Sequence, residues 1–368
     1  RTGPVRPDDV ATVIFSSGST GKPKGVMLSH HNILSNIEAA NMLLRLDATD
    51  RVCGTLPFFH AFGYTINCWL PWISSIGVSF HPNPLEAGRI TRMVREERCT
   101  LLVATPTFLL GYLRKADAED FQSVRHCIVG AEKLKPEIAE AFEHKFGLQP
   151  LEGYGATELS PLAACNVPDV SVDGVTQVGH KPGTVGHPLP GVTMKVVHPD
   201  TGAQCGEDEA GLLLVKGPNV MLGYLGEDMD TANVIQDGWY VTGDIVRMDR
   251  DGFITITDRL SRFSKVGGEM VPHIALEDAL HRGVGVPDRV VAVTAIPDAR
   301  RGEKLVVLHA PEAGDPADLH KIIQESDLPN LWRPARDAYV AVEEIPMLGS
   351  GKLDIKGLRA LAESARTG

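Results

Sequence analysis

The chain has 368 residues, of which 43% are hydrophobic and 23% are charged, so its composition fits a globular protein with buried cores. Its formal net charge of −11 argues against a general nucleic-acid binder, because neutralising phosphates requires a clustered positive surface. The six cysteines form no CxxC pair and no apolar run reaches 18 residues, so we expect reduced, mostly buried thiols and no membrane-spanning helix.

The first half of the chain alternates segments with strand and helix patterns. The predicted strands are 11–16, 100–104 and 126–129, and the predicted helices are 32–46, 108–115 and 136–146. Strands separated by helices favour a parallel sheet whose faces are covered by helices. We therefore predict that residues 1–182 form the α/β part of a larger domain.

The pattern changes after residue 182. Short alternating runs at 193–197, 211–216 and 253–257 are divided by Gly, Pro and Asp, which predicts a β-rich, barrel-like subdomain over 183–258. Residues 259–368 are predicted to form a small α+β domain, with the boundary at 258–262. Its predicted helices are 275–281 and 316–325, and its predicted strands are 289–296 and 304–309.

The most informative segment is a loop rich in glycine, hydroxyl side chains and lysine. It comprises Ser16, Ser17, Gly18, Ser19, Thr20, Gly21, Lys22, Pro23, Lys24 and Gly25. Glycines allow the backbone to approach an anion closely, and such loops bind phosphates through backbone N–H groups. Because the loop follows a strand and precedes a predicted helix, we favour a phosphate site over a flexible turn. It is not a Walker A loop, since only two residues separate Gly18 from Gly21 and Pro23 follows Lys22.

This loop resembles the phosphate signature of the adenylate-forming superfamily, which includes acyl-CoA synthetases, luciferases and the adenylation domains of peptide synthetases. In that superfamily the loop closes over the β- and γ-phosphates of ATP. Four further segments match in the family's order, and the last lies at 346–352. The resemblance implies an α/β adenylate-forming fold, with part of a large N-terminal domain and a mobile C-terminal domain.

The segment Tyr154-Gly155-Ala156-Thr157-Glu158 matches the second signature of the family. An aromatic ring beside a glycine can stack on adenine, the Thr157 hydroxyl can hold the α-phosphate, and the Glu158 carboxylate can bind Mg²⁺. The alternative is a turn at a strand end in which Thr157 caps a helix. That alternative would be favoured if this short motif stood alone.

Two further segments match the parts of the family that hold adenosine. Gly130, Ala131 and Glu132 follow an apolar strand and would line the adenine, although a plain strand-to-helix turn is an open alternative. Asp244, in a Thr-Gly-Asp motif, can accept hydrogen bonds from both ribose hydroxyls. Arg259 matches the family arginine that reaches the ribose and phosphate. As alternatives, Asp244 is a turn residue and Arg259 an exposed cation.

The C-terminal match contains Lys352, which in the family bridges the α-phosphate and the attacking carboxylate. Because a carboxylate attacking a phosphate brings two anions together, a shared cation lowers the barrier electrostatically. The family's hinge position, two residues after Arg259, is Ser261 here instead of the usual Asp or Lys. We expect Ser261 to serve as the hinge, and an ordinary linker serine is the alternative.

The segment 57–63 matches the family's aromatic gate, in which His60 would border the acyl channel. A packed aromatic turn is a comparable interpretation for Phe58 and Phe62. An apolar lining favours a fatty acid as the substrate, because each buried CH₂ contributes about 0.8 kcal/mol.

Longer strings at 129–134, 151–155, 262–271 and 348–352 resemble one subfamily. It is the acyl-carrier-protein synthetase part of the bacterial bifunctional 2-acylglycerophosphoethanolamine acyltransferase/acyl-carrier-protein synthetases. The resemblance implies transfer to acyl carrier protein, lysophospholipid acylation downstream, and an acyltransferase domain as a fused or associated partner. It also implies a cytoplasmic location, on the inner face of the bacterial membrane.

We therefore expect a ligase that uses ATP and Mg²⁺ to convert a fatty acid to acyl-AMP and then to a thioester. The alternatives are a fatty acyl-CoA or aryl-CoA synthetase, with CoA as the partner, and an inactive adenylate-binding fragment.

Overall fold

The computed structural model describes residues 3–17, 23–226, 231–286, 289–298, 300–347 and 353–367. The predicted site residues Gly18, Ser19, Thr20, Gly21, Lys22 and Lys352 lie outside the described residues, as do the side chains of Ser17 and Ser261. The chain divides into a large unit that ends at Thr257 and a small unit that begins at Asp258. The three-part division of the domains stays a prediction.

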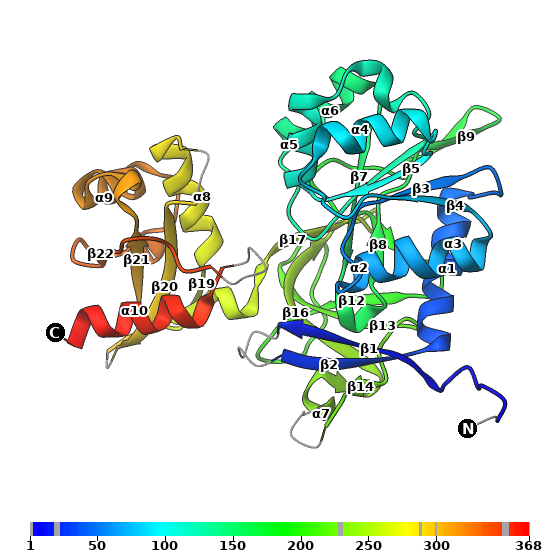
Figure 1. The fold of residues 1–368 in the computed structure, drawn as a ribbon. Coiled ribbons are helices and arrows are strands. Elements are labelled where there is room, and N and C mark those ends of the chain that lie inside the picture. Colours follow the sequence, from blue (N-terminus) through cyan, green and yellow to red (C-terminus); the bar gives the residue numbers. More distant parts are fainter. Residues whose placement is uncertain are drawn as a thin grey trace. The chain divides into compact units, whose positions relative to one another are not determined.

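A seven-stranded sheet forms the centre of the large unit (Figure 1). Its strands are β3 (Arg51–Gly54), β4 (Gly77–Phe80), β5 (Leu101–Ala104), β6 (His126–Val129), β7 (Pro150–Gly155), β8 (Leu162–Cys165) and β11 (His187–Pro188). They lie in the order β11-β8-β7-β6-β5-β3-β4. The strands from β4 to β7 are parallel, and β8 and β11 are antiparallel to their neighbours. The predicted parallel sheet is confirmed.

Helices cover both faces of this sheet. One face packs on α4 (Ala87–Glu96), α5 (Pro106–Lys115) and α6 (Pro136–Phe146), seen in cyan and green in Figure 1. The other face packs on α1 (His30–Leu44) and on α2 (Ala61–Tyr64), which continues through a π-helical turn, Thr65–Trp69, into α3 (Leu70–Ser74). Two apolar cores result, and the carboxyl ends of the parallel strands carry the segments with candidate site residues.

The phosphate-loop segment differs from the prediction. We expected a strand, the loop and then a helix at 32–46, and the structure contains an additional strand between the loop and that helix. β1 (Val10–Ser17) and β2 (Pro23–Ser29) form an antiparallel hairpin, and the predicted helix is α1, which begins at His30. The strand β2 was not predicted, and its residues 25–29 are largely buried and extended. β14 (Gly223–Tyr224) pairs with the other edge of β2.

The β-rich part of the large unit contains a five-stranded sheet. It contains β12 (Thr193–Val197), β13 (Gly211–Lys216), β15 (Ile235–Gln236), β16 (Trp239–Met248) and β17 (Ile254–Arg259). The short helix α7 (Thr231–Val234) precedes β15, and β9 (Val170–Val172) forms a separate hairpin with β10 (Val175–Gln177). Antiparallel pairing joins β12 to β13 and β13 to β16.

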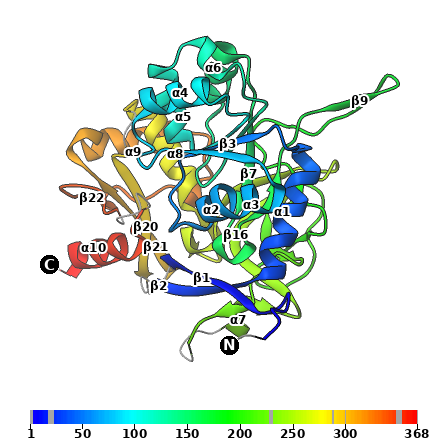
Figure 2. The same ribbon diagram turned by 45° about the vertical axis from the view of Figure 1, so that its right-hand side comes forward.

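The small unit is an α+β sandwich (Figure 2). Its strands are β18 (Phe263–Val266), β19 (Glu269–Pro272), β20 (Val291–Asp298), β21 (Gly302–His309) and β22 (Tyr339–Ala341). The helices α8 (His273–Val284) and α9 (Pro316–Glu325) pack on one face, and α10 (Ile355–Thr367) packs on the other. Both units also contain short 3₁₀ helices, at Ala118–Phe121, Thr157–Leu159, Leu260–Arg262, Pro311–Ala313 and Asn330–Trp332.

Ion pairs with the buried carboxylate of Glu277 stabilise the first residues of the small unit. The Arg262 guanidinium lies 2.5 Å from Glu277 Oε1, and Arg289 lies 3.6 Å from Glu277 Oε2. Burial raises the pKa of Asp258 to about 7 and lowers that of His273 to about 3. The negative charge of the Glu277 carboxylate is balanced by the guanidinium groups of Arg262 and Arg289.

All six cysteines are free thiols, and four of them are buried, as expected. None of the helices in the described ranges has the length and apolar composition needed to cross a bilayer.

Candidate functional site

The Thr-Gly-Asp motif forms a bulge in β16 that directs Asp244. Opposite Leu213 of β13, the strand β16 carries three residues instead of one, and Gly243 takes a left-handed φ of 76°. The Thr242 hydroxyl donates to the Leu213 carbonyl and accepts from the Asp244 amide. This arrangement explains the Thr-Gly-Asp sequence, because each residue closes or permits the bulge.

Asp244 meets the Tyr154 segment. The Tyr154 hydroxyl donates to Asp244 Oδ2 at 2.5 Å, although the two residues are 90 positions apart in sequence. Both side chains are buried, at 4% and 7% exposure for Asp244 and Tyr154 respectively. Burial and then the Asp244 charge raise the pKa of Tyr154, so its hydroxyl keeps its proton and orients the carboxylate. This hydrogen-bonding role adds to the adenine stacking predicted for Tyr154.

Tyr224 contacts both Glu158 and Lys24, which lies at the end of the phosphate loop. The Tyr224 hydroxyl donates to Glu158 Oε1 at 3.0 Å. The Lys24 ammonium lies over the Tyr224 ring, 4.7 Å from its centre. The described end of the glycine-rich loop and the Tyr154–Glu158 segment therefore lie in one neighbourhood.

Tyr240, from β16, lies beside both of these tyrosines. After burial and Asp244, Tyr240 adds to the rise in the pKa of Tyr154, and its hydroxyl partly offsets the rise that burial causes in the pKa of Tyr224. Tyr240 is 6% exposed. Three buried tyrosines thus connect the candidate ribose carboxylate with the candidate metal carboxylate.

Gly155 and Thr157 complete this segment. A Cβ at Gly155 would lie 2.0 Å from the Pro161 carbonyl oxygen, so only glycine allows this close approach. Thr157 begins the 3₁₀ helix Thr157–Leu159 and is partly exposed. Its predicted contact with the α-phosphate stays a prediction.

The predicted adenine segment follows β6. Ala131 has a left-handed φ of 69°, which a non-glycine residue adopts at a cost of about 1–3 kcal/mol, so the local fold holds this turn in place. The exposed Glu132 accepts a hydrogen bond from the Thr107 hydroxyl at 2.8 Å. A Cβ at Gly130 would lie 3.5 Å from the ring of Phe62, which brings this segment next to the predicted aromatic gate.

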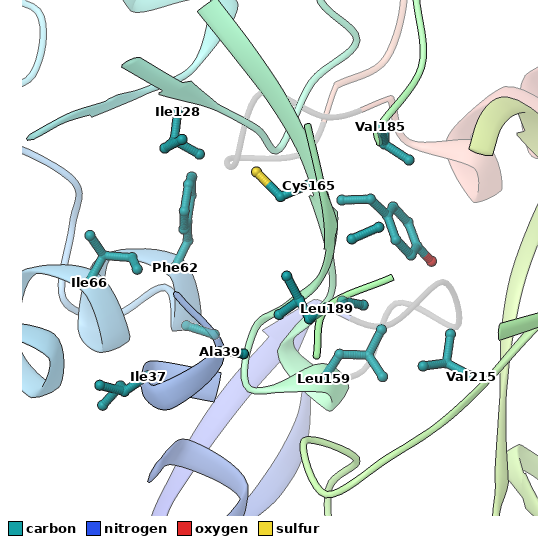
Figure 3. Packing of buried hydrophobic residues seen from close by; sticks show 14 of the residues in the cluster. Ile37, Ala39, Phe62, Ile66, Ile128, Leu159, Cys165, Val185, Leu189 and Val215 are labelled. Carbon is teal, nitrogen blue, oxygen red and sulfur yellow. The ribbon is translucent and has the colours of Figure 1, made fainter. Parts of the chain in front are cut away.

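In the gate segment, His60 and Phe62 take different positions. His60 is exposed and caps α2, where its Nδ1 accepts from the Phe62 amide at 3.3 Å. Phe62 points inward and lines an apolar cavity of about 30 Å³ together with Leu43, Ile66, Ile128, Leu162 and Cys165. Figure 3 shows Phe62, Ile128 and Cys165 pointing toward one another. Of the two interpretations for Phe62, the packed aromatic side chain is the one observed, and it also lines the cavity.

The remaining predicted residues belong to the small unit. Arg259 is exposed, and its amide donates to Asp258 Oδ1 at 2.7 Å. The backbone of Ser261 lies in the 3₁₀ helix Leu260–Arg262. The ribose role of Arg259, the hinge role of Ser261 and the catalytic role of Lys352 stay predictions.

Sequence reasoning missed Tyr224, Tyr240 and the cavity residues outside the gate. The Gly-Tyr pair 223–224 carries no local pattern that indicates a site. Only the pairing of β14 with β2 reveals that Tyr224 lies beside Lys24.

Comparisons with known proteins agree with these features. The family model described as AMP-binding enzyme matches residues 1–225. The chain belongs to the AMP-binding enzyme family. It is 33% identical to a long-chain fatty acid–CoA ligase of Bacillus subtilis over 94% of this chain and 60% of the relative. It is also 33% identical to a feruloyl-CoA synthase of an Amycolatopsis species over 96% of this chain and 70% of the relative.

A solved structure supports the fold of this AMP-binding enzyme. The o-succinylbenzoate–CoA synthetase of Bacillus subtilis, in complex with ATP and a magnesium ion, superposes with a TM-score of 0.80 at 25% identity. The match covers 96% of this chain and 70% of that chain. The adenylate-forming fold is therefore confirmed. The chain spans between about half and 70% of the length of the curated relatives it matches.

The described residues fit ATP and Mg²⁺, the cofactors of this family. Magnesium is usually held by one or two carboxylates together with substrate phosphates, so the lone Glu158 suffices. Glu158 is partly exposed, and the described residues contain no cluster of three or more His, Cys, Asp or Glu side chains that could hold a metal without a nucleotide. Glu158 would hold the Mg²⁺, which would supply positive charge next to the phosphates.

Proposed function

We propose that this chain activates a fatty acid with ATP and transfers the acyl group to the thiol of acyl carrier protein. In the first half-reaction a carboxylate oxygen attacks the α-phosphorus of ATP, the O–P bond to pyrophosphate breaks, and acyl-AMP forms. In the second, a thiol attacks the acyl carbon and AMP leaves. Lys352 would stabilise the first transition state and leave before the second, as the small unit turns at Ser261.

One observation carries the adenylation half. Asp244, Glu158 and Lys24 come from three distant segments, and the three buried tyrosines link them within one unit. Carboxylates and an ammonium placed in this way suit the ribose, the metal and the phosphates of one nucleotide.

The apolar cavity supports a fatty acid as the substrate. Its described lining residues are all hydrophobic, and Phe62 connects it to the Gly130 turn. Since the cavity holds only about 30 Å³, Phe62 or its neighbours must move to admit a long chain. The long-chain fatty acid specificity in the name of the Bacillus relative is consistent with this proposal.

For the thiol acceptor there are two candidates, acyl carrier protein and CoA. The resemblance at 262–271 and 348–352 favours acyl carrier protein, whereas the relatives named above are CoA ligases. Arg300 and Arg301 are exposed on the β20–β21 connection, and such a positive patch suits an acidic carrier protein on a chain of net charge −11.

The test is exchange of labelled pyrophosphate into ATP with fatty acids of graded length, followed by supply of CoA and acyl carrier protein in parallel. We expect exchange that depends on the acid and thioester formation on the carrier protein. A well-folded protein that binds ATP and gives no exchange with any acid would contradict the activation half. If the thioester forms on CoA alone, the acceptor in the proposed reaction is CoA and not the carrier protein. Arg300→Glu with Arg301→Glu should weaken only transfer to the carrier protein.

A further inference from the structure

We propose that Tyr224 is a positioning residue that fixes both the Glu158 carboxylate and the Lys24 ammonium for Mg²⁺-bound ATP. This inference rests on the proposed function, because that function gives Glu158 and Lys24 their metal and phosphate roles. It assigns a task to a residue that no motif indicated.

The backbone of Tyr224 is held on both sides. Tyr224 pairs with Val26 of β2, and the next residue, Leu225, donates its amide to the Gly25 carbonyl at 2.7 Å. The Tyr224 amide donates to the Thr231 hydroxyl at 3.0 Å. With the side chain only 7% exposed, the ring has a fixed position relative to the phosphate-loop hairpin.

The hydroxyl of Tyr224 orients Glu158 without neutralising it. It donates to Oε1 at 3.0 Å, and among the described residues no basic side chain forms an ion pair with Glu158. A phenol carries its proton at neutral pH, so the Tyr224 hydroxyl acts as the donor to the carboxylate. A neutral donor orients the carboxylate and leaves its negative charge available for a metal ion. Groups that hydrogen-bond to metal ligands in proteins commonly orient them in this way.

The ring of Tyr224 supports Lys24. The ammonium lies over the ring face at 4.7 Å from its centre, where the electron density of the ring attracts a cation. Lys24 pairs with Ser16 in the hairpin, so its backbone is fixed next to the glycine-rich loop. One side chain thus sets the separation between the carboxylate and the cation that face the nucleotide.

The two contacts can be separated by substitution. Tyr224→Phe removes the bond to Glu158 and keeps the ring under Lys24, whereas Tyr224→Leu removes both. ATP binding is measured by calorimetry at graded Mg²⁺ concentrations, without acid or thiol. For Tyr224→Phe we expect the Mg²⁺ concentration that half-maximally tightens ATP binding to rise about tenfold, within the 10–100-fold range typical of outer-shell substitutions. ATP binding without Mg²⁺ should be unchanged. Tyr224→Leu should weaken ATP binding without Mg²⁺ as well.

Two further variants make the test specific. Tyr339→Phe removes another buried hydroxyl, in the small unit, and should leave the Mg²⁺ dependence unchanged. In a Glu158→Gln background, Tyr224→Phe should have no further effect on the Mg²⁺ dependence, because the phenol acts through the carboxylate. A wild-type Mg²⁺ dependence in Tyr224→Phe, or an equal loss in both backgrounds, would overturn the positioning role. Intact Mg²⁺-dependent ATP binding without acid-dependent exchange would overturn the proposed function alone.

Discussion

The two candidate-site carboxylates of the large unit and the buried Glu277 of the small unit have different partners. In the large unit, Asp244 and Glu158 each accept a hydrogen bond from a tyrosine hydroxyl. In the small unit, Glu277 faces the guanidinium groups of Arg262 and Arg289 and accepts the Val293 amide. A neutral donor orients a carboxylate and preserves its charge for a ligand, whereas two guanidinium groups neutralise it. The difference is consistent with the binding role that we propose for Glu158 and with a structural role for Glu277.

The largest expected effect is on stability, at the structural carboxylate. Glu277→Ala leaves Arg262 buried without its partner, so we expect the small unit to lose about 3–5 kcal/mol in free energy of unfolding. Hydrogen exchange of amides in α8 and β20 would measure the loss. Glu325→Ala is the matched control, because Glu325 forms an exposed pair with Lys321 and should change stability by less than about 1 kcal/mol. Similar losses in the two variants would erase the distinction between the units.

The next effect concerns the small unit's predicted catalytic cation. Lys352→Ala should slow adenylation by about 10²–10³-fold, because the attack of carboxylate on phosphate loses its shared cation. Attack of a thiol on preformed acyl-AMP should remain near the wild-type rate. Rapid-quench assays of each half-reaction, with the exposed Lys321→Ala as control, would separate the two. An equal fall in both half-reactions would contradict the alternating role of the small unit.

Asp244→Ala should raise the Michaelis constant for ATP by about tenfold or more, since two charge-assisted hydrogen bonds to the ribose would be lost. The expected change in thermal stability is smaller than for Glu277→Ala. Steady-state kinetics with varied ATP would measure the constant. The exposed Asp251→Ala is the control. An unchanged dependence on ATP would remove Asp244 from the ribose site.

A further effect depends on pH and concerns Asp258. Because burial raises its pKa from 3.8 to about 7, the folded small unit binds this proton more tightly than the unfolded chain does. The stability contributed by the neutral carboxyl is therefore present below pH 4 and is lost as the pH rises to about 7.

Asp258→Asn keeps an acceptor for the amides of Arg259 and Ile274 and removes the titration. The variant should gain stability relative to wild type across this window, by about 2–4 kcal/mol at pH 8. Hydrogen exchange of β19 amides at several pH values would show it. A difference that is independent of pH would mean that Asp258 stays charged.

Much of the architecture follows from local sequence. The elements β6, α6, β12, β13 and α9 begin and end at the predicted residues. Each is a periodic or alternating run bounded by turn residues, so pattern alone defines it. The helix after the glycine-rich loop was predicted, but the strand β2 between the loop and that helix was not. The burial of residues 25–29 under β14 and β1 is a tertiary effect that the local pattern does not carry.

The candidate site shows the same limit. The motifs around Tyr154 and Asp244 were found from sequence, and the structure brings these two residues into contact. Tyr224 and Tyr240 were not found, since their importance depends on which strands lie next to each other. Phe62 was recognised in its segment, but its inward orientation and its contact with Gly130 come from packing across the sheet.

The most direct measurement follows one oxygen atom. A fatty acid labelled with ¹⁸O in its carboxylate is incubated with the protein, Mg²⁺, ATP and the thiol acceptor, and the nucleotide products are analysed by mass spectrometry. If the carboxylate attacks the α-phosphorus, one ¹⁸O atom remains on the phosphate of AMP after the thiol displaces it. AMP without the label, or labelled inorganic phosphate together with ADP, would contradict activation through acyl-AMP.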